Sequence, residues 1–231
     1  YKKFTRSQKS LGRLWNGNPF NYFQNKFAIP LFSTEGNIVN TKLYGRNNRI
    51  LLKRSDQMES LVIEEVNKVL TDFKQKTNRY EGLIYMMYWL EGQQVIPLYI
   101  GKSEKYGKKG NNLSSNIKNI SHNKSFFCRW GDNYAYHIGD LSAVVCLNHP
   151  KSKMNRKYEK WADRLFESYP TLHPTLRRAT YFWIHAWENG SIGIWKEFGS
   201  TSLTALEYHL ISVASTVFPY SLLNQEGVNR K

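Results

Sequence analysis

Two apolar and aromatic runs separated by a short turn constrain this chain most strongly. The first run, residues 82–90, has the sequence GLIYMMYWL, and the second, residues 95–101, has the sequence VIPLYIG. The intervening Glu91-Gly92-Gln93-Gln94 is polar and carries a glycine. Two such runs joined by a short glycine-containing loop predict a β-hairpin. The remaining elements must pack around this buried hairpin.

The charge balance limits the partners of the chain. Among 231 residues, 33 lysines and arginines face 18 acidic residues, which gives a net charge of +15. Such an excess favours a polyanionic partner, because each neutralised phosphate releases counterions. Nucleic acid is the first candidate and an anionic membrane surface the second. No apolar run reaches the roughly 18 residues of a membrane span, and no long basic amphipathic helix is visible, so we expect no membrane partner.

The cysteines and the first residues indicate an intracellular protein. Cys128 and Cys146 lie outside any metal-ligand spacing, so we expect two reduced thiols and no structural zinc. No signal peptide is visible, which together with the thiols predicts a cytoplasmic location.

The first quarter of the chain is strongly basic. Residues 1–56 carry eleven basic and two acidic residues, +9 of the total charge, with aromatic residues interleaved. This composition suits an arm that grips DNA, with Arg13 and Lys26 as candidate contacts, and equally a solvated arm that packs a few aromatics on the core. Ser55 is the expected N-cap of an amphipathic helix running to about Lys76, with Asp56 and Glu59 in its first turn. We take residues 1–80 as this basic arm and helix.

The second half of the chain alternates short elements. We expect a short helix over residues 111–120, a strand over 141–147 and a helix around 158–166. Residues 180–187 and 191–195 flank Glu188-Asn189-Gly190 and predict a second hairpin. A last helix is expected from Thr201 to about Val217, capped by one of the serines or the threonine at 200–202.

A carboxylate lies on the apolar face of that last helix. Leu203, Leu210, Ile211 and Ala214 stand at helical spacing from Glu207. Burying a carboxylate among such residues requires a cation, a metal or a strong hydrogen-bond donor. The alternative is a glutamate at the edge of the face, paired with one of the many lysines.

Three separated motifs resemble the GIY-YIG nuclease superfamily, closest in style to its type II restriction endonucleases. They are the triplets Leu83-Ile84-Tyr85 and Tyr99-Ile100-Gly101, the Glu207 helix, and Pro219 followed by Leu223-Asn224. The resemblance spans residues 80–226 and implies an α+β fold, with a small central mixed or antiparallel sheet flanked by helices. The core would be residues 81–231, with an insertion at about 148–200. The chain departs from the family in having leucine at 83 instead of glycine, and no arginine in the helix at 111–120.

The resemblance also implies a set of site residues. Tyr85 would be the general base, Tyr99 would position phosphate or water, and Glu207 would hold one Mg²⁺ or Mn²⁺. Charge neutralisation would fall to Lys102 or Arg129, while His137 would bond a tyrosine and Asn224 would steady the site. Besides Arg13 and Lys26, the expected DNA contacts are Lys105, Lys108, Lys109, Arg177 and Arg178.

The expected function is that of a Mg²⁺-dependent DNA endonuclease, sequence-specific and of restriction or nicking type. Its partners would be double-stranded DNA and, for two-strand cleavage, a second copy of the chain, with no small-molecule cofactor. Its source would be a bacterium, a phage or a mobile element. Two alternatives stay open: a catalytically inactive nucleic-acid-binding module with the same fold, and a homing endonuclease or nuclease toxin with the same chemistry.

Overall fold

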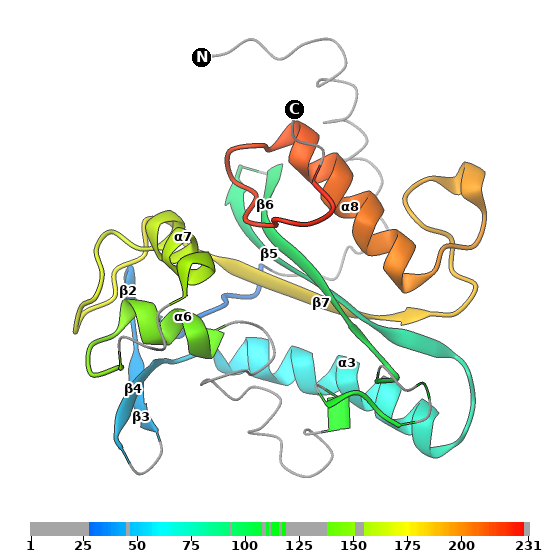
Figure 1. Cartoon of the computed structure of the whole chain (residues 1–231), viewed down its shortest axis with the longest axis horizontal. Helices are drawn as coiled ribbons and strands as arrows, with labels where there is room; N and C mark the ends of the chain where they lie inside the picture. Colours follow the sequence, from blue (N-terminus) through cyan, green and yellow to red (C-terminus); the bar gives the residue numbers. More distant parts are fainter. Residues whose placement is uncertain are drawn as a thin grey trace.

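The protein is an α+β structure built around a three-stranded antiparallel sheet. The computed structural model describes residues 28–44, 47–92, 94–107, 110, 112–115, 117–118, 138–150 and 155–228. The sheet has the strand order β6-β5-β7, with β5 (Tyr80–Glu91) between β6 (Gln94–Glu104) and β7 (Tyr181–Glu188). Helix α8 (Leu203–Val217) lies on one side of it, and α3 (Asp56–Lys74), α6 (Ile138–Val145) and α7 (Arg156–Leu165) lie on the other (Figure 1).

The predicted hairpin is confirmed and forms the centre of the sheet. β5 and β6 pair antiparallel, with Tyr85 opposite Gly101 and Met87 opposite Tyr99. Because side chains alternate between the two faces of a strand, Tyr85, Met87 and Tyr99 share one face. That face forms one hydrophobic cluster with α3, α6 and α7, and the opposite face, with Ile84 and Ile100, packs on α8.

The amphipathic helix predicted after Ser55 is also confirmed. The Ser55 side chain accepts a hydrogen bond from the backbone N–H of Met58, so it caps α3 as expected. Glu65, buried on α3, accepts a hydrogen bond from the backbone N–H of Ala186 at 2.7 Å. This carboxylate satisfies a donor on the outer edge of β7, where an unpaired strand edge would otherwise be exposed.

Small hairpins occupy the segment before α3. β1 (Thr34–Glu35) pairs with β2 (Ile38–Val39) across the predicted turn at Gly36, and β3 (Thr41–Tyr44) pairs with β4 (Arg49–Leu52). The expected helices at 158–166 and 201–217 are found as α7 and α8, and Ser202 caps α8. Of the helix expected at 111–120, Ser115, Ile117 and Lys118 are helical in the described part.

The strand predicted at 141–147 is wrong, because this segment forms α6. Leu141, Val144 and Val145 are fully buried, and so is Ser142, whose hydroxyl accepts a hydrogen bond from Leu52 of β4 at 3.2 Å. A short apolar run that is buried on all sides has no period that separates strand from helix. Asp140 in the first turn was the available helix signal.

The second predicted hairpin is wrong in its pairing. β7 does form and ends at a turn around Gly190, but it pairs with β5 and not with residues 191–195. In that segment Ile192 makes an isolated bridge to Ser200, and η2 (Lys196–Phe198) follows. β7 can pair with β5 over more residues than with the short run after Gly190. In β7, the Trp187 indole N–H also donates a hydrogen bond to the backbone oxygen of Thr201.

The described parts of the two segments expected from the sequence, residues 1–80 and 81–231, contribute to one hydrophobic core cluster. Buried residues from Leu31 to Ala186 belong to the cluster beneath the sheet, and β7, within the predicted insertion at 148–200, is the third strand of the sheet. In the part of the chain that the structure describes, no helix has both the length and the apolar character needed to cross a membrane.

Candidate functional site

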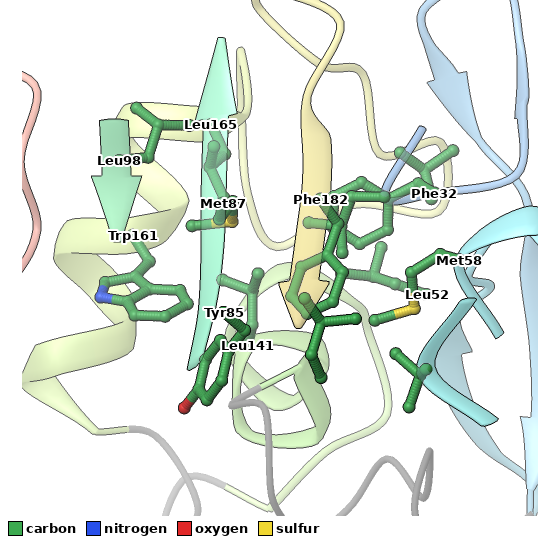
Figure 2. Close-up of a cluster of buried hydrophobic side chains, with 14 of the residues drawn as sticks. Phe32, Leu52, Met58, Tyr85, Met87, Leu98, Leu141, Trp161, Leu165 and Phe182 are labelled. Carbon is green, nitrogen blue, oxygen red and sulfur yellow. The ribbon is translucent and has the colours of Figure 1, made fainter. Parts of the chain in front are cut away.

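Tyr85 and Tyr99 lie side by side on one face of the sheet. Their ring centroids are 6.3 Å apart, and a hydrogen bond joins the two hydroxyl groups. Tyr85 is buried and stacks on Phe182 of β7 at 6.0 Å. Figure 2 shows its hydroxyl pointing away from Met87 and Phe182. The two motif tyrosines therefore converge on one face of the sheet.

Gly101 makes room for the Tyr85 ring. A Cβ atom built on Gly101 would lie 2.5 Å from the Tyr85 hydroxyl oxygen and 2.6 Å from the ring carbon that bears it. Any side chain at this position would therefore push the phenol out of place. The glycine that ends the second triplet thus has a steric reason, because it lies directly opposite Tyr85 in the register of the hairpin.

Tyr99 is surrounded by rings and by one cation from α7. Its ring lies 4.7 Å from that of Trp161, and the Lys157 Nζ atom lies 5.3 Å from its centroid. Burial and the negative charges of Glu207 and Glu226 raise the pKa of Tyr99 to about 12, against the lowering effect of the Tyr85 hydrogen bond. At neutral pH Tyr99 is consequently a phenol that accepts the hydrogen bond from Tyr85 and keeps its own proton.

Glu207 reaches the outer edge of β6, although its helix covers the other face of the sheet. Leu203, Leu210 and Ile211 of α8 are buried, whereas Glu207 is half-buried at the rim of that apolar face. Its carboxylate accepts a hydrogen bond from the backbone N–H of Lys102. Burial raises the pKa of Glu207, and the Lys102 charge and hydrogen bond oppose this rise. The expected strong donor is thus a backbone group of the edge strand.

Lys102 positions Glu207 through its backbone, and its ammonium group is already engaged. The Nζ atom donates hydrogen bonds to the Glu104 carboxylate and, at 2.5 Å, to the Thr204 hydroxyl. Both partners lie on the side of the sheet that α8 covers. The ammonium is therefore committed to Glu104, and the expected role of neutralising a phosphate suits it less well than the role of holding α8 against β6.

Asn224 fixes the C-terminal segment to β6. Its side-chain amide donates to the backbone oxygen of Ile100 at 2.7 Å and accepts from the backbone N–H of Ile100 at 2.9 Å. The backbone N–H of Leu223 also donates to Leu98 at 2.7 Å. The buried amide thus imitates a neighbouring strand next to Tyr99, a positioning contact of the kind expected for Asn224.

Sequence reasoning missed two charged residues of this site, Lys157 and Glu226. The Lys157 Nζ atom also lies 5.7 Å from the rings of both Tyr158 and Trp161, and burial lowers the pKa of Lys157 against the opposing charges of Glu226 and Asp140. Glu226 in turn raises the pKa values of Tyr99 and Glu207. Neither residue belongs to a motif, so no sequence signal identifies them.

Several expected site residues lie outside the described residues. They are Arg129 and His137 of the predicted catalytic set, and Arg13, Lys26, Lys108 and Lys109 of the predicted DNA contacts. Arg177 and Arg178 are described and exposed. Arg177 donates to the backbone oxygens of Asp163 and Glu167, and the Arg178 guanidinium lies 5.3 Å from the Trp89 ring.

The expected DNA contact of Lys105 is wrong, because its side chain is fully buried. The Nζ atom donates to the Asp72 carboxylate at 2.6 Å and to the backbone oxygen of Thr77 at 3.0 Å. Asp72 also accepts the Thr77 hydroxyl and the backbone N–H groups of Arg79 and Tyr80. This ion pair joins the end of α3 to the start of β5 and the end of β6.

Stability at acid pH should report this buried carboxylate. Burial alone would raise the pKa of Asp72, but the donors around it together lower it from the ordinary 3.8 to about 2. At pH values above 3.8 the Asp72 carboxylate contributes its full share, about 2 kcal/mol, to the free energy of unfolding. This contribution is lost as the pH falls towards about 2, because the unfolded chain takes up the proton at a higher pH than the folded chain. We expect urea unfolding of the wild type to lose this amount over that interval, and the variant Asp72→Asn to show a correspondingly shallower pH slope. Equal slopes would contradict the assignment.

The described residues contain no cluster of three or more histidine, cysteine or acidic side chains able to hold a metal. Among the described residues, Glu207 is the carboxylate that would hold a metal at this site, and Glu226 is its neighbour by charge. Mg²⁺ suits such a donor set, because it binds through one or two carboxylates and keeps several waters.

Comparison with protein-family models, with curated protein sequences and with solved structures gave no match.

Proposed function

We propose that this chain is a Mg²⁺-dependent DNA endonuclease that hydrolyses phosphodiester bonds with a GIY-YIG-like site. One observation supports the proposal: Tyr85 and Tyr99 are hydrogen-bonded to each other, and the Glu207 carboxylate, which is bonded at the outer edge of β6, raises the pKa of Tyr99. The resemblance expects two phenols and one carboxylate in this relation. The order of the three-stranded sheet, with Tyr85 on its central strand, is consistent with the expected core.

The residues present fit one divalent cation. Glu207 offers hard carboxylate oxygens, is half-exposed, and is held by the backbone of Lys102. When bound there, Mg²⁺ would polarise a phosphoryl oxygen and lower the pKa of a coordinated water. The net charge of +15 agrees with a nucleic acid as substrate.

The remaining steps belong to side chains of this chain. Tyr99, protonated at neutral pH, would donate a hydrogen bond to a non-bridging oxygen of the scissile phosphate. Tyr85, after passing its hydroxyl proton to solvent, would take a proton from the attacking water, whose oxygen forms the new bond to phosphorus. The bond from phosphorus to the sugar oxygen breaks in the same step, and that oxygen takes a proton from solvent. Lys157, beside Tyr99, would offset the developing negative charge.

A supercoiled-plasmid assay tests the proposal directly. We expect nicked or linear product with Mg²⁺ and none with EDTA, and the product form tells whether one or both strands are cut. Intact plasmid in Mg²⁺ or Mn²⁺, together with retained DNA binding, would overturn the nuclease and leave the binding module. Restriction, homing and toxin roles share this chemistry and are separated by the sequence that is cut.

Removing the Tyr85 hydroxyl should slow cleavage severely. We expect Tyr85→Phe to lower the rate by about 10²- to 10⁴-fold, the usual contribution of a positioned acid or base. The ring stays, so stacking on Phe182 and the fold are retained. Initial rates of plasmid nicking measure the effect, and Tyr208→Phe, which changes an exposed tyrosine of α8, is the matched control. A Tyr85→Phe rate near that of the control would move the base role to another residue.

A further inference from the structure

A groove lies between α7 and the C-terminal segment that follows α8. Its volume is about 640 Å³. Lys160 and Arg164 line it from α7, and Tyr220, Leu223 and Gln225 line it from the segment that follows α8. The tyrosine and leucine give the groove an apolar side opposite the cations.

Both walls of the groove continue into contacts with Tyr99 or its neighbours in β6. Lys157, whose Nζ atom is over the Tyr99 ring, is one turn before Lys160 on α7. On the other wall, Leu223 and Asn224 are bonded to Leu98 and Ile100, the residues on either side of Tyr99 in β6. The two walls therefore meet the sheet at the same point.

The cations of α7 form one row. Lys157, Lys160 and Arg164 are three and seven residues apart, which places them within about 60° on one side of the helix. Asp163, which also lines the groove, accepts a hydrogen bond from the Tyr169 hydroxyl at 2.7 Å. The row is about 10 Å long at the rise of an α-helix, which matches about three nucleotides of one strand.

An aromatic side chain stands across from this row. Tyr220 is 71 % exposed at the rim of the groove. Stacking on an aromatic ring needs an unpaired base, because the bases of a duplex already stack on one another. A row of cations facing an exposed ring is the combination that binds single strands, with phosphates on one side and a base on the other.

We infer that this groove binds about three unpaired nucleotides of a DNA strand leading away from the tyrosine pair. Lys160 and Arg164 contact the phosphates, and Tyr220 stacks on a base. The direction of the strand rests on the proposed function, whereas the binding itself does not, so the test uses EDTA and measures no cleavage.

Fluorescence anisotropy with a short fluorescein-labelled oligothymidylate tests the inference on the full chain. The variant Lys160→Gln/Arg164→Gln keeps good helix formers and removes two charges. We expect it to weaken binding about tenfold or more and to lower the salt slope by about 1.4, from two lost phosphate contacts. The control Lys74→Gln/Lys196→Gln removes two exposed charges elsewhere, on α3 and η2. It should change the affinity and the salt slope far less than the groove variant does.

The stacking contact has its own variant pair. Tyr220→Ala should weaken binding about 5- to 150-fold, whereas Tyr220→Phe should bind like the wild type, because the ring is retained. An oligonucleotide of abasic sites should bind the wild type and Tyr220→Ala equally.

Two results would overturn the inference. One is equal loss in the Lys160/Arg164 pair and in the control pair, which would indicate general attraction to a basic protein. The other is equal weakening of duplex and single-stranded probes by the groove variants, which would indicate a duplex contact. A protein that never cuts DNA can still pass this test, and a nuclease can fail it, so the two proposals are separable.

Discussion

Replacing Glu207 by glutamine is expected to lower Mg²⁺-dependent cleavage by about 10³-fold or more while DNA binding is retained. Glutamine keeps the size of the side chain and can still accept the backbone N–H of Lys102, so α8 should stay in place. It loses the charge that attracts a divalent cation. Lewis-acid stabilisation of a phosphoryl transition state is worth several kcal/mol, and each 1.36 kcal/mol is a tenfold change in rate. Initial rates of plasmid nicking measure the loss.

Measuring the DNA affinity of the same variant separates a loss of catalysis from a loss of substrate binding. Affinity for duplex DNA in EDTA should not fall in Glu207→Gln, because cations supply it and the substitution removes a negative charge. Glu197→Gln changes the charge equally at an exposed site on η2 and should cut DNA at the wild-type rate. Unimpaired Mg²⁺-dependent cutting by Glu207→Gln would remove the metal role of this residue, and with it the proposed mechanism.

Local patterns predicted the elements whose signals are local. The hairpin has two continuous apolar and aromatic runs joined by a polar turn. α3 and α8 have a cap residue followed by helical spacing of apolar residues. α6 lacked such a signal, because Leu141, Ser142, Val144 and Val145 are buried all round and leave no polar face. The partner of β7 was beyond local reasoning, since it lies about a hundred residues away in β5.

The sequence indicates the site residues that belong to motifs. It does not indicate residues that only tertiary packing brings next to them. Tyr85 and Tyr99 converge because the hairpin register sets them diagonally. Glu207 lies at the edge of β6, bonded to the Lys102 backbone, and its charge raises the pKa of Tyr99. Lys157 stands over Tyr99 only because α7 packs its Trp161 on that ring. Because α7 carries no motif, the sequence does not indicate the contact between Lys157 and Tyr99.

Lys105 illustrates the opposite error. It lies in a lysine-rich run after the second triplet, with exposed Glu104 before it. The composition of this run predicts a solvated loop, and its place beside the triplet predicts a loop that borders the substrate phosphates. Its partner Asp72 is 33 residues earlier, at the end of α3. Only the pairing of β5 with β6 brings the two together, so the charge that looked functional is structural.

Replacing Lys105 by methionine is therefore expected to destabilise the fold by about 3–5 kcal/mol. The substitution fills a similar volume but leaves the Asp72 carboxylate buried without its cation, and a buried charge that loses its partner costs about this much. Urea unfolding should show a lower midpoint with an unchanged slope. Lys74→Met, at an exposed position of α3, is the matched control and should shift stability by no more than about 0.5 kcal/mol.

A second substitution separates loss of the cation from loss of packing. Asp72→Asn in the Lys105→Met background removes the uncompensated charge, while the amide oxygen can still accept one of the neighbouring backbone donors. We expect the double variant to be more stable than Lys105→Met alone, because the penalty arises mainly from the buried charge. If the double variant were instead less stable by the full effect of Asp72→Asn, the two residues would be energetically independent. Lys105 would then act through its packing at the end of β6, and a phosphate-binding role for it would still be excluded by its complete burial.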